Sequence, residues 1–419
     1  MTRESASAGD ARRRLLLDLL QAGLARVDGR LCVARALRAD GGVPAGPVRV
    51  AAVGKAASAM ALGAYEALQS SIQHLLLITK DGHVSPQVRN LPHVEVYESA
   101  HPLPDERSLA AGERLLRWVD ELPRDAQPLF LISGGASSLV EVLEQGVTFA
   151  DLARINREGQ ASGEPIGALN TRRARVSRIK GGRLAARLGG RAARALFISD
   201  VPGDDPSVIG SGLMGPAPQV DKADKADKAD SVQRTIVASV GSAVDAVRAA
   251  AVALGLTVHA SAVRFDDDAG RLAIRFAHEL RLSQAQVCVW GGESTVRLPA
   301  QPGIGGRNQQ LALGVARLIA GQSDLALLAA GTDGTDGPTE DAGAIVDGDT
   351  VARISLGGLD ADRCLAAADA NAALAVAGDL VHTGPTGTNV GDLVIGLMLP
   401  SSAARAALEQ HGGLRPRVL

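Results

Sequence analysis

Short apolar runs alternate with segments of helical periodicity along most of the chain. Runs such as 48–53 and 325–330 have no polar alternation, which is typical of strands buried on both faces of a sheet. The leucines of segment 15–24 recur at helical spacing and predict an opening helix of the fold. The pattern predicts a protein that begins with an amphipathic helix and continues with buried strands.

The apolar runs of the first half are each followed by a glycine-containing turn and a helical segment. Their predicted positions are 48–53, 74–79, 94–97, 128–132 and 195–199. In the second half, 232–254 is predicted as one long helix, and strands are predicted near 256–260 and at 286–290, 325–330 and 393–398. Repetition of strand, turn and helix predicts an α/β fold.

Composition excludes several classes of function. With 44 basic and 46 acidic residues, the chain has no net field that would attract nucleic acid, and 2% aromatic content leaves few rings for stacking bases. No apolar run approaches the roughly 18 to 20 residues of a membrane span. Three isolated cysteines favour a reducing compartment. We therefore expect a soluble, cytoplasmic protein that acts on a small molecule, and the oligomeric state stays open.

A triplet repeat, DKADKADKAD at 221–230, divides the chain. It has no apolar face to bury and is typical of a solvated linker. A length of 419 residues suggests two or three domains. We expect an N-terminal domain at 1–230 and a C-terminal domain at 231–419.

The loop 331–343, which follows the strand 325–330, contains four glycines and four carboxylates in thirteen residues. Glycines allow close approach of the backbone to a ligand, and aspartate oxygens suit a hard cation such as Mg²⁺. Asp333 and Asp336 are the candidate metal ligands in the loop, together with Glu293 at the end of another strand. The alternative is an acidic surface turn.

Three further signals follow predicted strands of the first half. Lys55 lies where the strand 48–53 meets a helix, so its charge would add to the free amides at a helix N-terminus, although a solvent-facing lysine is the alternative. The segment 133–138 supplies Ser133, Gly134, Gly135 and Ser137 for a phosphate cradle. Asp200 follows 195–199, where a carboxylate can hold a metal that bridges phosphates.

Other basic and polar segments have two readings each. The basic cluster 169–185, which includes Lys180, is either a solvated helix face or a phosphate clamp. Arg307 and Asn308 follow three glycines at a predicted helix start, which suits anion binding, although a water-exposed arginine is the alternative. The loop around Thr386 and Asn389 is rich in glycine and hydroxyl groups.

Two weaker signals complete the survey. His101 lies between a strand and a helix, where a structural role is more common than substrate orientation. The segment 210–215 matches GxGxxG, but it lacks a preceding strand and is followed by Pro216, so we discount it as a dinucleotide site.

Taken together, these signals provide backbone cradles, cations and metal-suited carboxylates, which are the requirements of phosphoryl transfer. The chain resembles the glycerate 2-kinases that carry a C-terminal MOFRL domain. The matching blocks are VGKAASAM, HPLPDERS, LISGGASSL, LNTRRARVSRIKGGRLA, ISDVPGDD, GGESTV, GGRNQQLAL, AGTDGTDGPTEDAGAIVD and TGPTGTNVGD.

The resemblance implies a Rossmann-like N-terminal domain with a parallel sheet, a smaller α/β C-terminal domain and an active site in the interdomain cleft. It further implies phosphorylation of D-glycerate at the 2-hydroxyl with ATP and Mg²⁺. Lys55 and Arg307 match the charged pair expected to face across the cleft, where they would neutralise the phosphoryl group and the substrate carboxylate. Asp200 and the Asp333/Asp336 loop would hold Mg²⁺ or orient the attacking hydroxyl.

Two alternatives stay open: an NAD(P)H-dependent hydroxypyruvate reductase, as some relatives are labelled, and a non-catalytic sensor of sugar acids or nucleotides. The chain also departs from the family pattern. Relatives usually show SGPT where residues 211–216 read SGLMGP, and they often have His at the position of Arg175. The repeat at 221–230 is a third departure and suggests a surface insertion.

Overall fold

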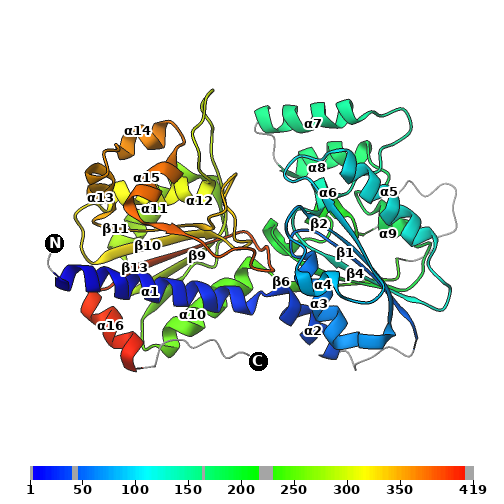
Figure 1. Cartoon of the computed structure of the whole chain (residues 1–419), viewed down its shortest axis with the longest axis horizontal. Helices are drawn as coiled ribbons and strands as arrows, with labels where there is room; N and C mark the ends of the chain where they lie inside the picture. Colours follow the sequence, from blue (N-terminus) through cyan, green and yellow to red (C-terminus); the bar gives the residue numbers. More distant parts are fainter. Residues whose placement is uncertain (1–2, 40–45, 163–165, 217–229, 411–419) are drawn as a thin grey trace. The chain divides into compact units, whose positions relative to one another are not determined.

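The computed structural model describes residues 3–39, 46–162, 166–216 and 230–410 (Figure 1). These residues form two compact units, each described by itself below. The N-terminal unit contains Asp28–Ser239 and Gly387–Val390; the C-terminal unit contains the first helix, Val240–Thr386 and the chain from Gly391. This division differs from the expected boundary at 230/231. The repeat that suggested that boundary lies, except for Asp230, outside the described residues.

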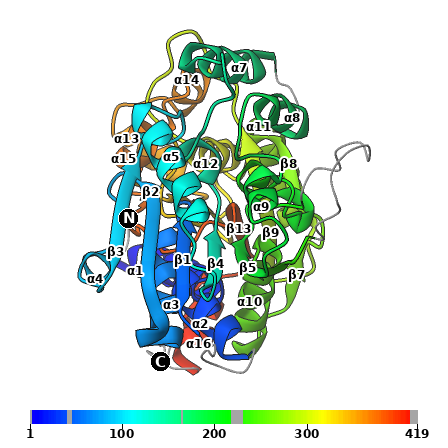
Figure 2. The same ribbon diagram turned by 90° about the vertical axis from the view of Figure 1, so that its right-hand side faces the viewer.

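A parallel sheet of six strands forms the centre of the N-terminal unit. Its strands are β1 (Val48–Val53), β2 (Ile72–Lys80), β3 (Val94–Ser99), β4 (Gln127–Ile132), β5 (Ala193–Ile198) and β6 (Val232–Ala238). They are ordered β3-β2-β1-β4-β5-β6, and Figure 2 shows the first five side by side. This is the strand order of a Rossmann fold, so the prediction of a Rossmann-like parallel sheet is confirmed.

Helices cover both faces of this sheet, as βα repeats require. The helices of the unit are α2 (Gly29–Ala39), α3 (Ala57–Leu68), α4 (Pro86–Arg89), α5 (Glu106–Asp120), α6 (Ala136–Leu139), α7 (Phe149–Ser162), α8 (Ile166–Arg175) and α9 (Arg183–Arg187), of which α7 and α8 pack on each other rather than on a face of the sheet. Residues of α5, α6 and α9 share one apolar core with β1, β2, β4 and β5, whereas α2 and α3 pack together beside β1 and β6. Asp105 caps α5 by accepting from the N–H groups of Arg107 and Ser108.

The helix predicted over 232–254 is wrong in its first third. Val232–Ala238 is instead strand β6, which pairs in parallel with β5, and the helix α10 begins only at Val240. Four of the seven residues of VQRTIVA are β-branched and fit a pleated surface. The edge of the N-terminal sheet therefore lies after the triplet repeat.

A mixed sheet of seven strands forms the centre of the C-terminal unit. Its strands are β7 (Val258–Ala260), β8 (Phe265–Asp268), β9 (Val287–Thr295), β10 (Leu325–Gly331), β11 (Gly343–Asp347), β12 (Leu380–Val381) and β13 (Asp392–Met398). The order is β12-β11-β10-β13-β9-β7, and β8 also pairs with β9. Pairing is antiparallel from β12 to β9, whereas β7 and β8 run parallel to β9.

The helices of this unit lie on the two faces of its sheet (Figure 1). Helices α1 (Arg3–Arg26), α10 (Val240–Ala253) and α16 (Ser401–Gln410) pack on one face. Helices α11 (Ala269–Leu282) and α12 (Arg307–Leu318) pack on the other with α13 (Thr350–Leu356), α14 (Ala361–Ala366) and α15 (Ala370–Ala377). The opening helix is confirmed, since all the predicted apolar positions of α1 are buried: Leu15, Leu16, Leu19, Leu20 and Leu24.

Across the parts of the chain that the structure describes, a membrane-crossing helix is not found: none is both long and apolar enough.

Candidate active site

The carboxyl ends of β1, β4 and β5 bring three of the predicted segments together in the N-terminal unit. Gly134, in the loop after β4, is their meeting point: a Cβ atom there would lie 1.9 Å from Oδ2 of Asp200 and 2.2 Å from Nδ2 of Asn389. Asn389 in turn donates a hydrogen bond to Asp200 at 3.3 Å. Only glycine fits this position, so the glycine loop, Asp200 and Asn389 form one cluster.

Lys55 belongs to the same cluster. Its backbone N–H donates to the carbonyl of Gly134 at 2.9 Å, and the N–H of Ala56 donates to Oγ of Ser133 at 3.0 Å. A Cβ on Gly135 would lie 3.0 Å from Cγ of Lys55, and Gly135 has a φ of +82°, which an L side chain rarely adopts. The loop after β4 therefore fixes the backbone from which the lysine side chain extends.

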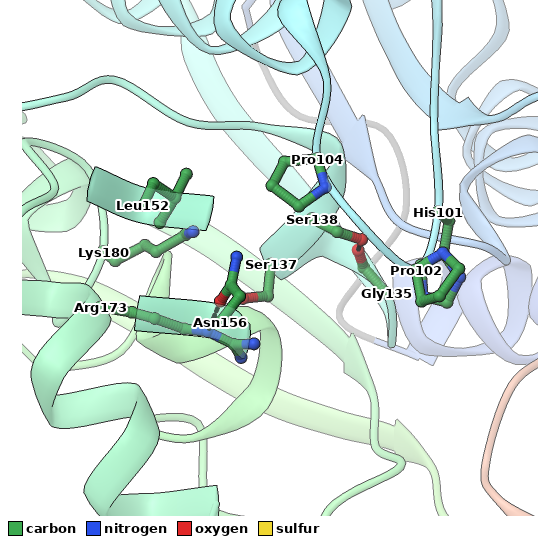
Figure 3. A pocket seen from close by; sticks show the side chains of 10 residues that line it. All are labelled: His101, Pro102, Pro104, Gly135, Ser137, Ser138, Leu152, Asn156, Arg173 and Lys180. Atoms are coloured by element: carbon green, nitrogen blue, oxygen red, sulfur yellow. Dashed lines mark hydrogen bonds between the residues drawn. The ribbon is translucent and has the colours of Figure 1, made fainter. Parts of the chain in front are cut away.

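A pocket of about 130 Å³ opens beside this loop, which we call the Ser137 pocket (Figure 3). The pocket is lined by residues of the loop after β4, of helices α7 and α8, and of the turn after β3. Its polar lining consists of His101, Ser137, Ser138, Asn156, Arg173 and Lys180. The hydroxyl of Ser137 is 2.6 Å from that of Ser211, which holds one wall of the pocket in place.

Lys180, predicted for a phosphate clamp, is held in an ion pair. Its Nζ donates to Oε2 of Glu141 at 2.6 Å, and the two side chains are 2% and 0% exposed. Burial lowers the pKa of Lys180, and the Glu141 carboxylate opposes that shift. Lys180 lines the Ser137 pocket, and the Glu141 carboxylate largely cancels the positive charge that Lys180 would offer to a ligand. Its part in ligand binding stays a prediction.

In the C-terminal unit, Arg307 lies between two carboxylates. Its Nη1 donates to Oε1 of Glu293 at 2.6 Å, and its Nη2 lies 3.7 Å from Oδ1 of Asp392. Burial alone would lower the pKa of Arg307, but Asp392 and Glu293 outweigh it and raise the pKa. Burial also raises the pKa of Asp392. Arg307 is therefore permanently charged, and that charge is already balanced by neighbouring carboxylates.

Asp336 caps the helix that carries Arg307. Its two carboxylate oxygens accept the backbone N–H groups of Asn308 and Gln309 at 3.1 and 2.8 Å, which are orphan donors of the first turn of α12. Gly306 allows this approach, since a Cβ there would lie 2.1 Å from Cγ of Asp336. These contacts show that Asp336 acts as the cap of helix α12. The spacing of residues in the sequence did not indicate this role.

We expect Asp336→Asn to lower the urea midpoint of unfolding, because a carboxyl group, protonated or ionised, has an acceptor oxygen for each of the two helix N–H groups, whereas an amide accepts only one and turns its NH₂ towards the other. Leaving one buried donor unpaired costs about 1–3 kcal/mol. Burial raises the pKa of Asp336 to about 7, above the unfolded value. Between the pKa of Asp336 in the unfolded chain and its pKa of about 7 in the folded protein, the folded protein binds the extra proton. The wild type therefore loses stability as pH rises through this interval. The difference in free energy of unfolding between wild type and Asp336→Asn should become smaller from pH 5 to pH 8. A difference that does not change with pH would contradict the raised pKa of Asp336.

Asp333 and Thr386, the two remaining predicted residues of this unit, lie in two loops that contact each other. Oδ1 of Asp333 accepts from the backbone N–H of Thr335 at 3.1 Å, a local turn contact, and Thr386 donates its hydroxyl to the carbonyl of Thr332. A Cβ on Gly334 would lie 2.0 Å from the carbonyl of Gly384. The glycines of 331–343 therefore serve, at least here, close packing of two loops.

Metal binding by Asp333, Asp336 and Glu293 stays a prediction, and their contacts weigh against it. Asp336 is occupied by backbone donors, and Glu293 faces Arg307 on one oxygen and Arg264 on the other, at 3.6 Å. Within the described ranges, no group of three or more His, Cys, Asp or Glu side chains is arranged to hold a metal ion.

Sequence reasoning missed three residues that the structure places in these clusters. Asp392 is 2% exposed and accepts a hydrogen bond from Asn308 at 3.0 Å, and its position at the start of a strand after a glycine loop was an available signal. Glu141 and Asn156 had no such signal, because an apolar segment surrounds the first and a helix the second. Their roles depend on tertiary contacts.

Two family models match the chain. One, described as "Domain of unknown function (DUF4147)", covers residues 15–247, and the other, described as "MOFRL family", covers residues 286–392. Together they span both units and include every predicted site residue.

Named relatives cover most of the chain. The D-glycerate 2-kinase of Thermotoga maritima is 36% identical over 382 residues, which are 84% of this chain and 91% of that protein. A protein of Agrobacterium vitis named putative hydroxypyruvate reductase is 34% identical over 415 residues, 91% of this chain and 93% of the relative. The crystal structure of the glycerate kinase from Thermotoga maritima matches with a TM-score of 0.80 at 32% identity, covering 93% of this chain and 100% of that one.

Proposed function

The chain belongs to the glycerate 2-kinase family with a C-terminal MOFRL domain, and from this membership we propose that it transfers the γ-phosphoryl group of ATP to the 2-hydroxyl of D-glycerate. The observation that carries the proposal is the 36% identity with a D-glycerate 2-kinase over 91% of that protein's length.

The cluster around Gly134 supports phosphoryl transfer chemically. Phosphoryl transfer requires positioning and charge stabilisation rather than a covalent intermediate. Lys55, held by the loop after β4, supplies a cation, and the glycines of that loop let phosphate oxygens approach the backbone. We assign Lys55 to charge stabilisation in the transition state, and Ser133, Gly134 and Gly135 to the phosphate cradle.

The donor set of this cluster also suits Mg²⁺. Mg²⁺ is usually held by one or two carboxylates together with substrate phosphates, and when bound it neutralises charge on the phosphates. Asp200 offers a carboxylate oxygen 3.3 Å from Nδ2 of Asn389, at the edge of the sheet where the glycine loop ends. We assign Asp200 to the ion, in preference to Asp333, Asp336 and Glu293, because Asp200 lies at the same edge of the sheet as Lys55 and the glycine loop.

We expect Asp200→Asn to raise the Mg²⁺ concentration for half-maximal activity at least about tenfold, with activity partly restored by excess Mg²⁺. Asp205→Asn is the control in the same loop, because that exposed residue only caps the N–H of Ser207, which asparagine can also do. Asp333→Asn belongs to the same titration. A shift with Asp333→Asn and none with Asp200→Asn would move the ion to the C-terminal unit.

Hydroxypyruvate reduction is the second candidate, because a relative has that name. It requires binding of a nicotinamide dinucleotide, for which a glycine fingerprint between strand and helix is the expected signal. The GxGxxG match at 210–215 begins within the 3-10 helix η3 (Ile209–Gly212) and continues into a turn, not between a strand and an α-helix. That geometry favours the kinase.

Activity measured on the purified full chain separates the two. With ATP, Mg²⁺ and D-glycerate we expect formation of ADP that depends on glycerate, and with NADH or NADPH and hydroxypyruvate we expect no oxidation of the nucleotide. ADP formation that does not depend on glycerate, or oxidation of NAD(P)H, would overturn the proposal. Binding of glycerate or ATP without turnover would instead favour the sensor alternative.

A further inference from the structure

The Ser137 pocket has the size and charge of a site for a small organic acid. Resting on the proposed kinase function, we propose that it holds the phosphoryl acceptor and that Arg173 binds the acceptor's carboxylate. The sequence had given this role to Arg307 or Lys55, and the structure provides three reasons to assign it to Arg173.

The first reason is size. The pocket measures about 130 Å³, well below the roughly 300–1,000 Å³ of sites for drug-sized ligands. This volume is too small to enclose a nucleoside triphosphate, whereas a three-carbon acid has few enough atoms to fit. Pro102, Pro104 and Leu152 provide apolar lining for its carbon chain.

The second reason is the balance of charge. Arg173 uses its Nε to donate to Oδ1 of Asn156 at 2.8 Å and its Nη1 to donate to Oδ1 of Asn170 at 3.3 Å, so both of these partners are neutral amides. Within the described part of the chain, no carboxylate forms an ion pair with Arg173, whereas Lys180 is paired with Glu141. These three charged groups leave the pocket with a net charge of one positive unit, which matches a monocarboxylate.

Arg307 differs in this respect, since Glu293 and Asp392 lie 2.6 and 3.7 Å from its guanidinium. A substrate carboxylate would have to compete with both. The carboxylate that acts on the charge of Arg173 is Glu141, which is already paired with Lys180 at 2.6 Å. A substrate carboxylate therefore competes less at Arg173 than at Arg307, and the planar fork of arginine suits two parallel hydrogen bonds.

The third reason is the position of the pocket relative to the chemistry. Gly135 lines the pocket and lies beside Lys55 of the cluster around Gly134: a Cβ on Gly135 would lie 3.0 Å from Cγ of Lys55 and 3.2 Å from Cδ2 of His101, another lining residue. Figure 3 shows His101 and Gly135 at one end of the pocket, with Arg173 and Asn156 towards the other. An acid whose carboxylate lies at Arg173 can therefore direct its hydroxyl groups towards Lys55.

The test uses variants of the full chain. Arg173→Met should raise the KM for D-glycerate about 10- to 100-fold, the value of a lost charge-assisted hydrogen bond, and change the KM for ATP less than twofold. Arg173→Lys should restore part of the loss. Asn156→Asp keeps the arginine but places a carboxylate beside it, so it should also raise the KM for D-glycerate. Arg187→Ala, which removes an exposed ion pair with Asp120 in the same unit, should change neither KM.

A neutral substrate distinguishes carboxylate recognition from a structural role. The wild type should prefer D-glycerate over D-glyceramide, in which an amide replaces the carboxylate, and Arg173→Met should lose most of that preference. An unchanged KM and an unchanged preference in Arg173→Met would overturn the inference. If Arg173→Met fails to fold, as judged by circular dichroism, the same two measurements on Asn156→Asp decide it.

Equilibrium binding of D-glycerate, measured by calorimetry without nucleotide, separates this inference from the kinase proposal. An inactive wild type that binds D-glycerate, with loss of binding in Arg173→Met, would overturn the kinase function and support the pocket. An active wild type with equal glycerate binding and KM in both proteins would overturn the pocket and leave the kinase function standing. No binding and no activity would overturn both.

Discussion

Replacing Lys55 by methionine is expected to lower kcat for phosphorylation of D-glycerate by about 10²- to 10³-fold, the usual loss when a preorganised donor to the transition state is removed. The stem of methionine fills nearly the same space, so the loop after β4 should keep its contacts with the backbone of residues 55 and 56. The loss should therefore appear in kcat, with little change in the stability of the N-terminal unit.

Two comparisons make this prediction specific. Arg89→Ala removes another cation of the same unit, whose side chain is 52% exposed and paired with Glu98, and should leave kcat unchanged. Lys55→Arg keeps the charge and should recover part of the activity. A Lys55→Met enzyme with kcat within threefold of wild type would exclude Lys55 from the chemical step.

Replacing Arg307 by methionine is expected to lower stability, because the side chain balances two carboxylates, and to lower activity, because the sequence predicts a role for Arg307 in phosphoryl transfer. Asp392 is 2% exposed, so without Arg307 its ionised form would remain buried with less compensation. Loss of one partner of a buried pair costs about 3–5 kcal/mol, and we expect about 1–3 kcal/mol here because Arg307 is 39% exposed. If Arg307 also stabilises the transferred phosphoryl group, as the sequence predicts, kcat should fall about 100-fold.

The double variant Arg307→Met/Asp392→Asn separates the two effects. It removes the buried charge together with its partner, so it should recover much of the lost stability in urea unfolding without recovering kcat. Arg317→Ala, on the same helix and paired with exposed Asp362, is the control for loss of an arginine from α12. Recovery of kcat in the double variant would show that Arg307 has only a structural role.

Local sequence patterns were sufficient for most of the N-terminal fold. Each run predicted there as a strand is a strand of the parallel sheet. The inner strands β1, β4 and β5 are buried almost throughout, which leaves little room for polar alternation, whereas the edge strand β3 has intermediate burial. The error at 232–238 arose where an edge strand has mostly intermediate burial, so its mixed composition also fitted a helix. Pairing with β5, a long-range contact, decided between the two.

The candidate sites were predicted less completely than the fold. Lys55, Asp200 and the glycine loop were each predicted from a strand end, and the structure places them together because the carboxyl ends of parallel strands lie on one edge of the sheet. Their roles stay predictions. Side-chain partners could not be predicted. Asp336 as the cap of α12 and Lys180 as the partner of Glu141 depend on residues 28 and 39 positions away in sequence. A carboxylate suited to a metal and a carboxylate suited to a helix N-terminus look alike in sequence.

The position of the transferred phosphoryl group tests the central claim most directly. The wild-type protein, ATP, Mg²⁺ and D-glycerate are incubated and the product is examined by proton-coupled phosphorus NMR. Transfer to the 2-hydroxyl places phosphorus next to the single hydrogen of carbon 2 and predicts a doublet from 2-phosphoglycerate. A triplet from the two hydrogens of carbon 3, or no phosphate ester at all, would contradict the account.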